Sequence, residues 1–286
     1  MNLGTIYMQL GKLDQALAST LNSIELKQDN PIGLINLGNI YRKKGDHKNN
    51  KAALDKAREI EPSCLNLQIN AAQAFKVIHN DESEVDEERR NFAEATRYIL
   101  EHSELKYRND LPINLGIFWL SYHGRDDDIE LTQKFWGALA NNSNIKKITS
   151  KFRSRSKSDG ECSSIKIGII SNFWGEYHPV NLHYSEIIKH FIDTEIKVEI
   201  IVGQSVSQNE QREIESRYGT TVSRLTQNFE MNCKTISELN LDLLLYPDIG
   251  MSSDTYLLGL ARLAPVQAVM AGHPCSTGLK EIDYFI

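Results

Sequence analysis

Two loops in the second half of the chain carry the side chains best suited to proton chemistry. The first, Ser171–Pro179, contains His178, and histidine is a common general acid or base in proteins. The second, Pro247–Ser253, contains the carboxylate of Asp248. Each has a plainer interpretation, because a histidine before a proline can cap a helix and an aspartate in a glycine-containing loop is common in turns.

A third loop, Gly272–Gly278, has the composition of a ligand cradle. Its glycines permit close approach of the backbone, and the hydroxyls of Ser276 and Thr277 together with backbone N–H groups could approach a phosphate. The alternative is a turn that only joins two strands.

The elements around these loops predict a parallel, doubly wound sheet, a Rossmann-like lobe. Apolar strands alternate with helices: strands are expected at 165–170, 195–202, 221–224 and 242–246, and helices at 180–191, 208–218 and 232–239. In such sheets ligands bind at the carboxyl ends of the strands, where the three loops fall. No GxGxxG follows the first strand, which disfavours a dinucleotide cofactor.

The first third of the chain is an internal repeat. The pattern LGxxYxxxG begins at Leu3 and again at Leu37, 34 residues later. This period is typical of tetratricopeptide repeats, pairs of helices that stack into a solenoid. In each repeat the first glycine should let the two helices pack closely, and the second, Gly11 or Gly45, should start the turn between them.

A third, decayed unit is expected at 66–78. Stable arrays need about three or more repeats, so we expect the array to begin upstream of Met1 in a longer protein. The concave face of the solenoid could hold a peptide partner, or the repeats could be a spacer; the sequence leaves both open.

We therefore divide the chain into repeats (1–79), a helical bridging region (80–142), a basic linker (143–164) and an α/β lobe (165–286). Within the bridging region, Pro112–Gly124 is predicted to be a buried helix, and His123 to be a structural cap. The linker concentrates lysine and arginine, but Phe152 is its only aromatic residue that could stack on a base, so a solvated connection is favoured over a nucleic-acid site.

Composition narrows the function classes. A net charge of −6 argues against a nucleic-acid binder, and no apolar run is long enough to span a membrane. The four cysteines lack CxxC spacing, which suggests neither a zinc site nor a disulfide frame and fits a cytoplasmic protein.

Against this background the chain resembles the O-linked N-acetylglucosamine transferase family, bacterial type. The resemblance lies in the strings ISNFWGEYHPV, YPDIGM, RLAPVQAVMAGHPCSTG and EIDYF, and in the order of repeats before an α/β lobe. It implies the amino-terminal half of a GT-B glycosyltransferase. In such an enzyme an acceptor hydroxyl attacks the anomeric carbon of a UDP-linked sugar with inversion of configuration, and no metal cofactor is needed. A protein or peptide acceptor held by the repeat groove is the implied partner.

The resemblance also assigns site residues. It implies catalytic roles for His178 and Asp248, which would orient the acceptor or accept its proton. The implied substrate-binding residues are Pro179, Gly250, Gly272, His273, Pro274, Ser276, Thr277 and Gly278. His273 stands where many members carry an aromatic residue, and the spacing of His183 departs from some relatives, so His183 receives no role.

Three interpretations stay open. The leading one is part of a protein glycosyltransferase whose other lobe supplies most donor contacts, and we expect the chain alone to be inactive. The second is a tetratricopeptide interaction scaffold with a non-catalytic α/β lobe. The third is a transferase acting on a lipid or small glycan.

Overall fold

The computed structural model describes residues 3–154, 164–175, 177–194, 196–270 and 276–286. Contacts divide the chain into two units, each with its own hydrophobic core. Unit 1 comprises Met1–Asp128 and Asn141–Asn144, and unit 2 comprises Ile129–Ala140 and Ile145–Ile286.

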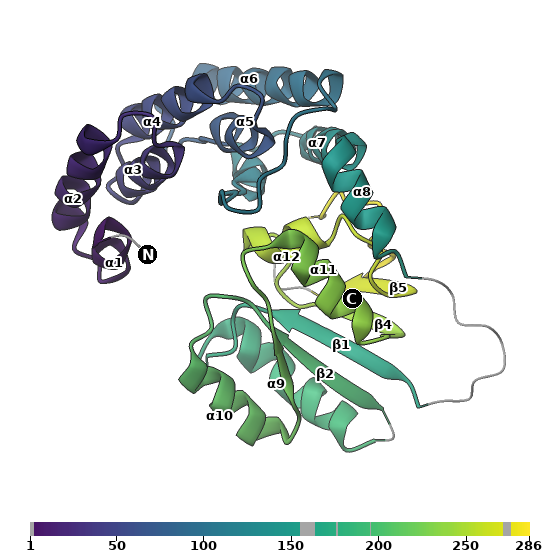
Figure 1. Cartoon of the computed structure of the whole chain (residues 1–286). Helices are drawn as coiled ribbons and strands as arrows, with labels where there is room; N and C mark the ends of the chain where they lie inside the picture. The colour runs from purple at the N-terminus through teal and green to yellow at the C-terminus, as the bar shows by residue number, and fades with distance from the viewer. Residues whose placement is uncertain (1–2, 155–163, 176, 195, 271–275) are drawn as a thin grey trace. The chain divides into compact units, whose positions relative to one another are not determined.

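Unit 1 is a helical solenoid (Figure 1). Its α-helices are α1 (Leu3–Gln9), α2 (Leu13–Leu26), α3 (Pro31–Lys43), α4 (His47–Ile60), α5 (Leu65–Ala72) and α6 (Glu82–Glu101). Neighbouring helices pack on one another in chain order, as repeat architectures require. Helix α5 corresponds to the predicted third unit.

The repeat glycines occupy the predicted roles. A Cβ on Gly38 in α3 would lie 3.1 Å from Leu54 Cγ in α4, so the two helices of this repeat are as close as a glycine permits. Gly11 and Gly45, in the turns, have positive φ angles of 72° and 74°. That left-handed conformation is strained for other residues, which explains the repeated glycine.

The segment Pro112–Gly124 differs from its prediction as a continuous helix. Only Ile117–His123 is helical, as a 3₁₀ turn (η1), and the chain before it is held without regular structure. The reason is a stripe of buried amide side chains on and directly after α5, at Asn66, Asn70 and Gln73. These side chains take the hydrogen bonds that a helix would have made within its own backbone.

The amide stripe bonds the backbone of residues 108–116 repeatedly. Asn66 Nδ2 donates to the carbonyls of Arg108 (2.9 Å) and Leu111 (2.7 Å), and its Oδ1 accepts from Arg108 N–H (2.8 Å). Asn70 Oδ1 accepts from Asn114 N–H (2.7 Å), and Gln73 Oε1 accepts from Gly116 N–H (2.6 Å).

Unit 2 contains a six-stranded, all-parallel sheet in the order β3-β2-β1-β4-β5-β6. The strands are β1 (Lys166–Ser171), β2 (Lys197–Val202), β3 (Val222–Arg224), β4 (Leu243–Tyr246), β5 (Val266–Val269) and β6 (Tyr284–Phe285). The helices between them are α9 (Pro179–Ile192), α10 (Gln208–Tyr218), α11 (Phe229–Glu238) and α12 (Ser253–Leu258). The predicted strands and helices of the lobe are all present, with ends shifted by up to three residues.

Helices cover the two faces of this sheet, with α9 and α10 on one and α11 and α12 on the other (Figure 1). Alternate residues of β1 and β2, such as Ile167, Ile169 and Ile200, share one core cluster with Tyr184 of α9 and Ile214 of α10. A sheet covered on both faces buries every residue of its central strands, which accounts for the uninterrupted apolar runs.

The predicted basic linker begins instead as a helix, so the expectation of an open connection was wrong for its first part. Helix α8 (Ser143–Lys151) buries Ile145 and Ile148, whose spacing of three places both on one face. The rest of the predicted linker lies mostly outside the described residues. The preceding helix, α7 (Asp128–Asn141), begins at an acidic residue, which suits the positive end of a helix.

None of the described helices combines the length and the apolar character needed to cross a bilayer.

Candidate functional site

The sheet order of unit 2 fixes where a ligand should bind. Along the sheet, the chain runs from β1 outward through β2 and β3, then returns to the other side of β1 with β4. In open parallel sheets, ligands bind at the carboxyl ends of the strands where the order reverses in this way, here between β1 and β4. The loops after these two strands contain His178 and Asp248.

Asp248 lies at this reversal point and is fully buried. Its Oδ2 accepts hydrogen bonds from Asn172 N–H (3.1 Å) and Ser171 Oγ (3.2 Å), so it joins the loop after β4 to the end of β1. The other oxygen, Oδ1, is buried with no hydrogen-bond partner among the described residues. Burial raises the pKa of Asp248 to about 6, against the lowering effect of these hydrogen bonds. Asp248 therefore differs from an ordinary, solvent-exposed turn aspartate.

Asn172 extends this connection to a third loop. Its Nδ2 donates to Ser252 Oγ (2.6 Å) after β4, and its Oδ1 accepts from Ser205 Oγ (2.9 Å) after β2. A Cβ on Gly203 would lie only 1.6 Å from Asn172 Oδ1, so the amide occupies space that only glycine leaves free. One side chain thus fixes the carboxyl ends of β1, β2 and β4 relative to one another.

His178 is the N-cap residue of α9, and Pro179 is its first helical residue. The imidazole Nδ1 accepts a hydrogen bond from Val180 N–H (3.3 Å), and the ring stacks on Phe173 with centroids 4.5 Å apart. An Nδ1 that accepts a hydrogen bond places the proton of the neutral ring on Nε2. The predicted capping role is present, and it leaves Nε2–H as a donor.

The third predicted loop is only partly described, because Gly272, His273 and Pro274 lie outside the described residues. Thr277 is buried, and its carbonyl accepts hydrogen bonds from Trp136 Nε1 (3.0 Å) and Tyr256 Oη (2.8 Å). Its hydroxyl accepts from Leu279 N–H at 3.2 Å. In the described part, Thr277 therefore anchors the loop, and Ser276 is the exposed hydroxyl.

Two further loop glycines have left-handed backbones. Gly250 has φ 96° and Gly278 has φ 68°. A Cβ on Gly278 would also lie 2.6 Å from Thr132 Cγ2 of α7. Glycine at 278 is thus required by conformation and by packing, whether or not a ligand approaches it.

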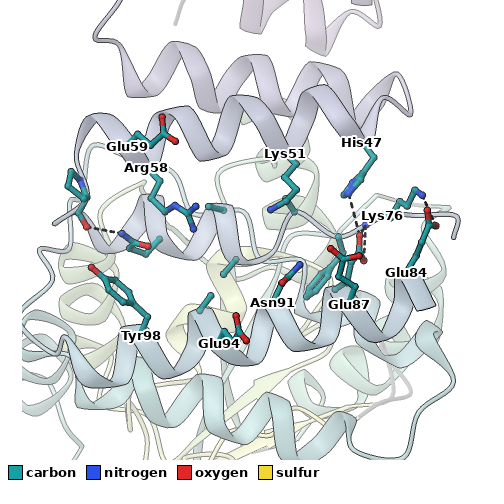
Figure 2. A pocket seen from close by; sticks show the side chains of 18 residues that line it. His47, Lys51, Arg58, Glu59, Lys76, Glu84, Glu87, Asn91, Glu94 and Tyr98 are labelled. Carbon is teal, nitrogen blue, oxygen red and sulfur yellow. Dashed lines mark hydrogen bonds and ion pairs between the residues drawn. The ribbon is translucent and has the colours of Figure 1, made fainter. Parts of the chain in front are cut away.

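A second candidate site lies on unit 1. A groove with a volume of about 690 Å³ runs between α4 and α6 (Figure 2). Helix α4 contributes the basic side chains Lys51 and Arg58, while α6 contributes Glu94 and Tyr98 from the opposite wall. The α6 wall is thus acidic, whereas the α4 wall carries both signs, because Glu59 also lines the groove and Lys51 and Arg58 pair with Asp55.

Sequence reasoning missed Ser171, Asn172, Gly203 and Ser252 as site residues. One signal was available for Asn172: a polar residue directly after a buried strand falls at the carboxyl edge of a parallel sheet. For Gly203, the neighbouring sequence does not show whether glycine is needed for close packing against another side chain or only for a turn.

Comparison with family models confirms the repeats. A model described as TPR repeat matches residues 4–45, and one described as tetratricopeptide repeat matches residues 33–64. A search of curated protein sequences gave no match.

Among solved structures, the chain is similar to a mutant of the O-GlcNAc transferase of Thermobaculum terrenum, with a TM-score of 0.59 and 14% identity. The match covers 99% of this chain and 51% of that one, so the chain spans about half the length of that enzyme. A structure of MamA matches 53% of the chain with a TM-score of 0.31 and 14% identity. The chain thus combines a helical tetratricopeptide-type solenoid with a parallel α/β sheet, and this combination occurs in an O-GlcNAc transferase.

Proposed function

We propose that this chain belongs to a nucleotide-sugar-dependent glycosyltransferase that modifies protein side chains. The observation that carries the proposal is the buried Asp248 at the reversal point of the sheet, within a chain that matches an O-GlcNAc transferase over nearly its whole length. The sheet edge is where a nucleotide sugar and its acceptor would meet.

In this proposal Asp248 is a positioning residue. Its side chain has no exposure to solvent, so it acts through the groups that it holds, Ser171 and Asn172. Fixing the ends of β1, β2 and β4 before the ligand arrives lowers the entropic cost of assembling the site.

His178 is the candidate catalytic residue. With Nδ1 bonded to Val180 N–H, the neutral ring can donate a hydrogen bond from Nε2. Donation suits the orientation of an acceptor oxygen or the stabilisation of charge on the departing diphosphate. Proton acceptance at Nε2 would first require release of the cap or a change of tautomer.

The reaction would be a single displacement. The acceptor hydroxyl attacks the anomeric carbon and gives its proton to water, while the bond from that carbon to the nucleoside diphosphate breaks with inversion and the diphosphate leaves. Such a step depends on positioning and on charge stabilisation rather than on a covalent intermediate. The repeats support a protein acceptor, since tetratricopeptide arrays commonly bind peptides.

The test uses protein expressed from the complete natural reading frame, a panel of radiolabelled UDP-linked and GDP-linked sugars, and a peptide library. Transfer of label to peptide, weakened by changes at His178, is the expected result. Peptide binding without transfer from any donor would favour an interaction scaffold instead, and transfer only to lipids or free glycans would remove the protein acceptor.

A further inference from the structure

A cluster of imidazole and carboxylate groups in unit 1 has no part in the proposed transfer reaction. It consists of His79, which follows α5, Glu88 on α6 and His123 at the end of η1. One ligand atom from each lies within 4.8 Å of the others. We propose that these three residues form a binding site for a zinc-class divalent metal ion.

The donor set fits such an ion. Zinc binds imidazole nitrogen and carboxylate oxygen at about 2.0–2.2 Å, and tetrahedral geometry then sets ligand atoms about 3.3 Å apart. His79 Nε2 is 2.9 Å from Glu88 Oε2, a separation that must open slightly. The 4.8 Å limit on the other pairs leaves at most about 1.5 Å to close, which side-chain rotation can supply.

His123 supplies the independent sign of a missing ligand. Its side chain is 7% exposed, yet neither ring nitrogen has a hydrogen-bond partner within the described part of the chain. A buried polar group without a partner is costly and uncommon. Its ring lies edge-on to that of His79, with centroids 5.0 Å apart, and one of its unpartnered nitrogens is the atom that lies within 4.8 Å of the ligand atoms of His79 and Glu88.

The surrounding groups hold the carboxylate in place. Lys76 N–H donates to both oxygens of Glu88 (2.9 and 3.2 Å), and His47 Nε2 lies 3.3 Å from Glu88 Oε1. Outer contacts of this kind orient metal ligands and raise affinity. Two nearby cations are neutralised by other partners, since Lys76 Nζ pairs with Glu84 and Arg89 pairs with Asp128.

A metal at this position would connect the loop after α5, helix α6 and the end of η1. Three protein ligands leave a fourth position for water or a ligand.

The test uses the untagged full chain, stripped with chelator and titrated with Zn²⁺ by calorimetry. We expect one equivalent to bind, and affinity to fall at least about tenfold in H79Q and in E88Q. His190 is exposed on α9, so H190Q is the matched control and should bind like the wild type. Absence of zinc binding by the wild type, or binding by H79Q and E88Q with the affinity of the wild type, would overturn the site.

Either variant can lose stability, so X-ray absorption on the zinc-loaded wild type provides a second measurement. Two imidazoles and a carboxylate oxygen at about 2.0–2.2 Å are expected. A thiolate ligand, or a shell of water alone, would contradict the assignment.

Discussion

The amide of Asn172 lies against the backbone of Gly203 so closely that no side chain fits between them. The contact places Asn172 between Ser205 and Ser252 and fixes three strand ends at once. The geometry of the candidate site therefore depends on a residue with no side chain.

Replacement of Gly203 by alanine should displace Asn172 and break these hydrogen bonds. Overpacking of a filled site costs about 1–3 kcal/mol, so we expect the free energy of unfolding to fall by that amount in urea titrations. Gly137 is the matched control, because it lies within α7 and an added methyl group would have no described atom within 4 Å. Gly137→Ala should raise stability by roughly 0.5–1 kcal/mol. Equal behaviour of the two variants would contradict the contact.

Asp248→Asn should change the pH dependence of stability. The pKa of Asp248 is about 6 in the folded chain, above the ordinary value of 3.8, so the folded state binds the proton more tightly. That contribution to stability is fully present below about pH 3.8 and is lost as the pH rises towards 6.

The asparagine variant retains an acceptor for Asn172 N–H but carries no charge. Its stability relative to the wild type should therefore rise by on the order of 2–3 kcal/mol between pH 4 and pH 7. Urea titrations of both proteins at the two pH values measure the difference. A pH-independent difference would show that the carboxyl titrates normally.

His178 offers a way to separate helix capping from chemistry. Asparagine is a good N-cap residue, so His178→Asn should keep the stability of α9, whereas His178→Ala should lose about 1 kcal/mol. If the imidazole donates a hydrogen bond in the transfer reaction, both variants should lose about 10²–10³-fold in kcat. Full activity in the asparagine variant would restrict His178 to capping.

Asn66→Ala should destabilise unit 1 strongly. The side chain is fully buried and makes three hydrogen bonds to the backbone of residues 108–111, whose groups would be left without partners. Each stranded buried group costs about 1–3 kcal/mol, which thermal and urea unfolding can resolve. Asn91→Ala, at an exposed position of α6, is the control and should be neutral or slightly stabilising. A loss no larger than that of the control would refute the role of the stripe.

Much of the fold could be predicted because its signals are local. The 34-residue spacing of Leu3 and Leu37 gives the repeat, and apolar runs such as Ile167–Ile170 give the buried strands. The sequence also predicted that the loops with His178 and Asp248 follow strands of the parallel sheet, and these loops do follow β1 and β4.

What could not be predicted depends on long-range partners. Pro112–Gly124 begins with proline and ends with glycine, as helices often do. Its backbone nevertheless hydrogen-bonds to amide side chains about 40 residues earlier in the chain. Asn66, Asn70 and Gln73 are polar residues at helical spacing, a pattern that usually marks a solvated face. Their burial follows only once residues 108–116 are in place.

The same amide stripe limits how the solenoid can change in evolution. Tetratricopeptide arrays ordinarily gain or lose units one at a time, because each repeat offers its neighbour the same docking face. Here, one face of α5 is committed to the backbone of residues 108–116. A duplicated repeat inserted after α5 would separate the amides from their partners, so the array can lengthen before its third unit but not beyond it.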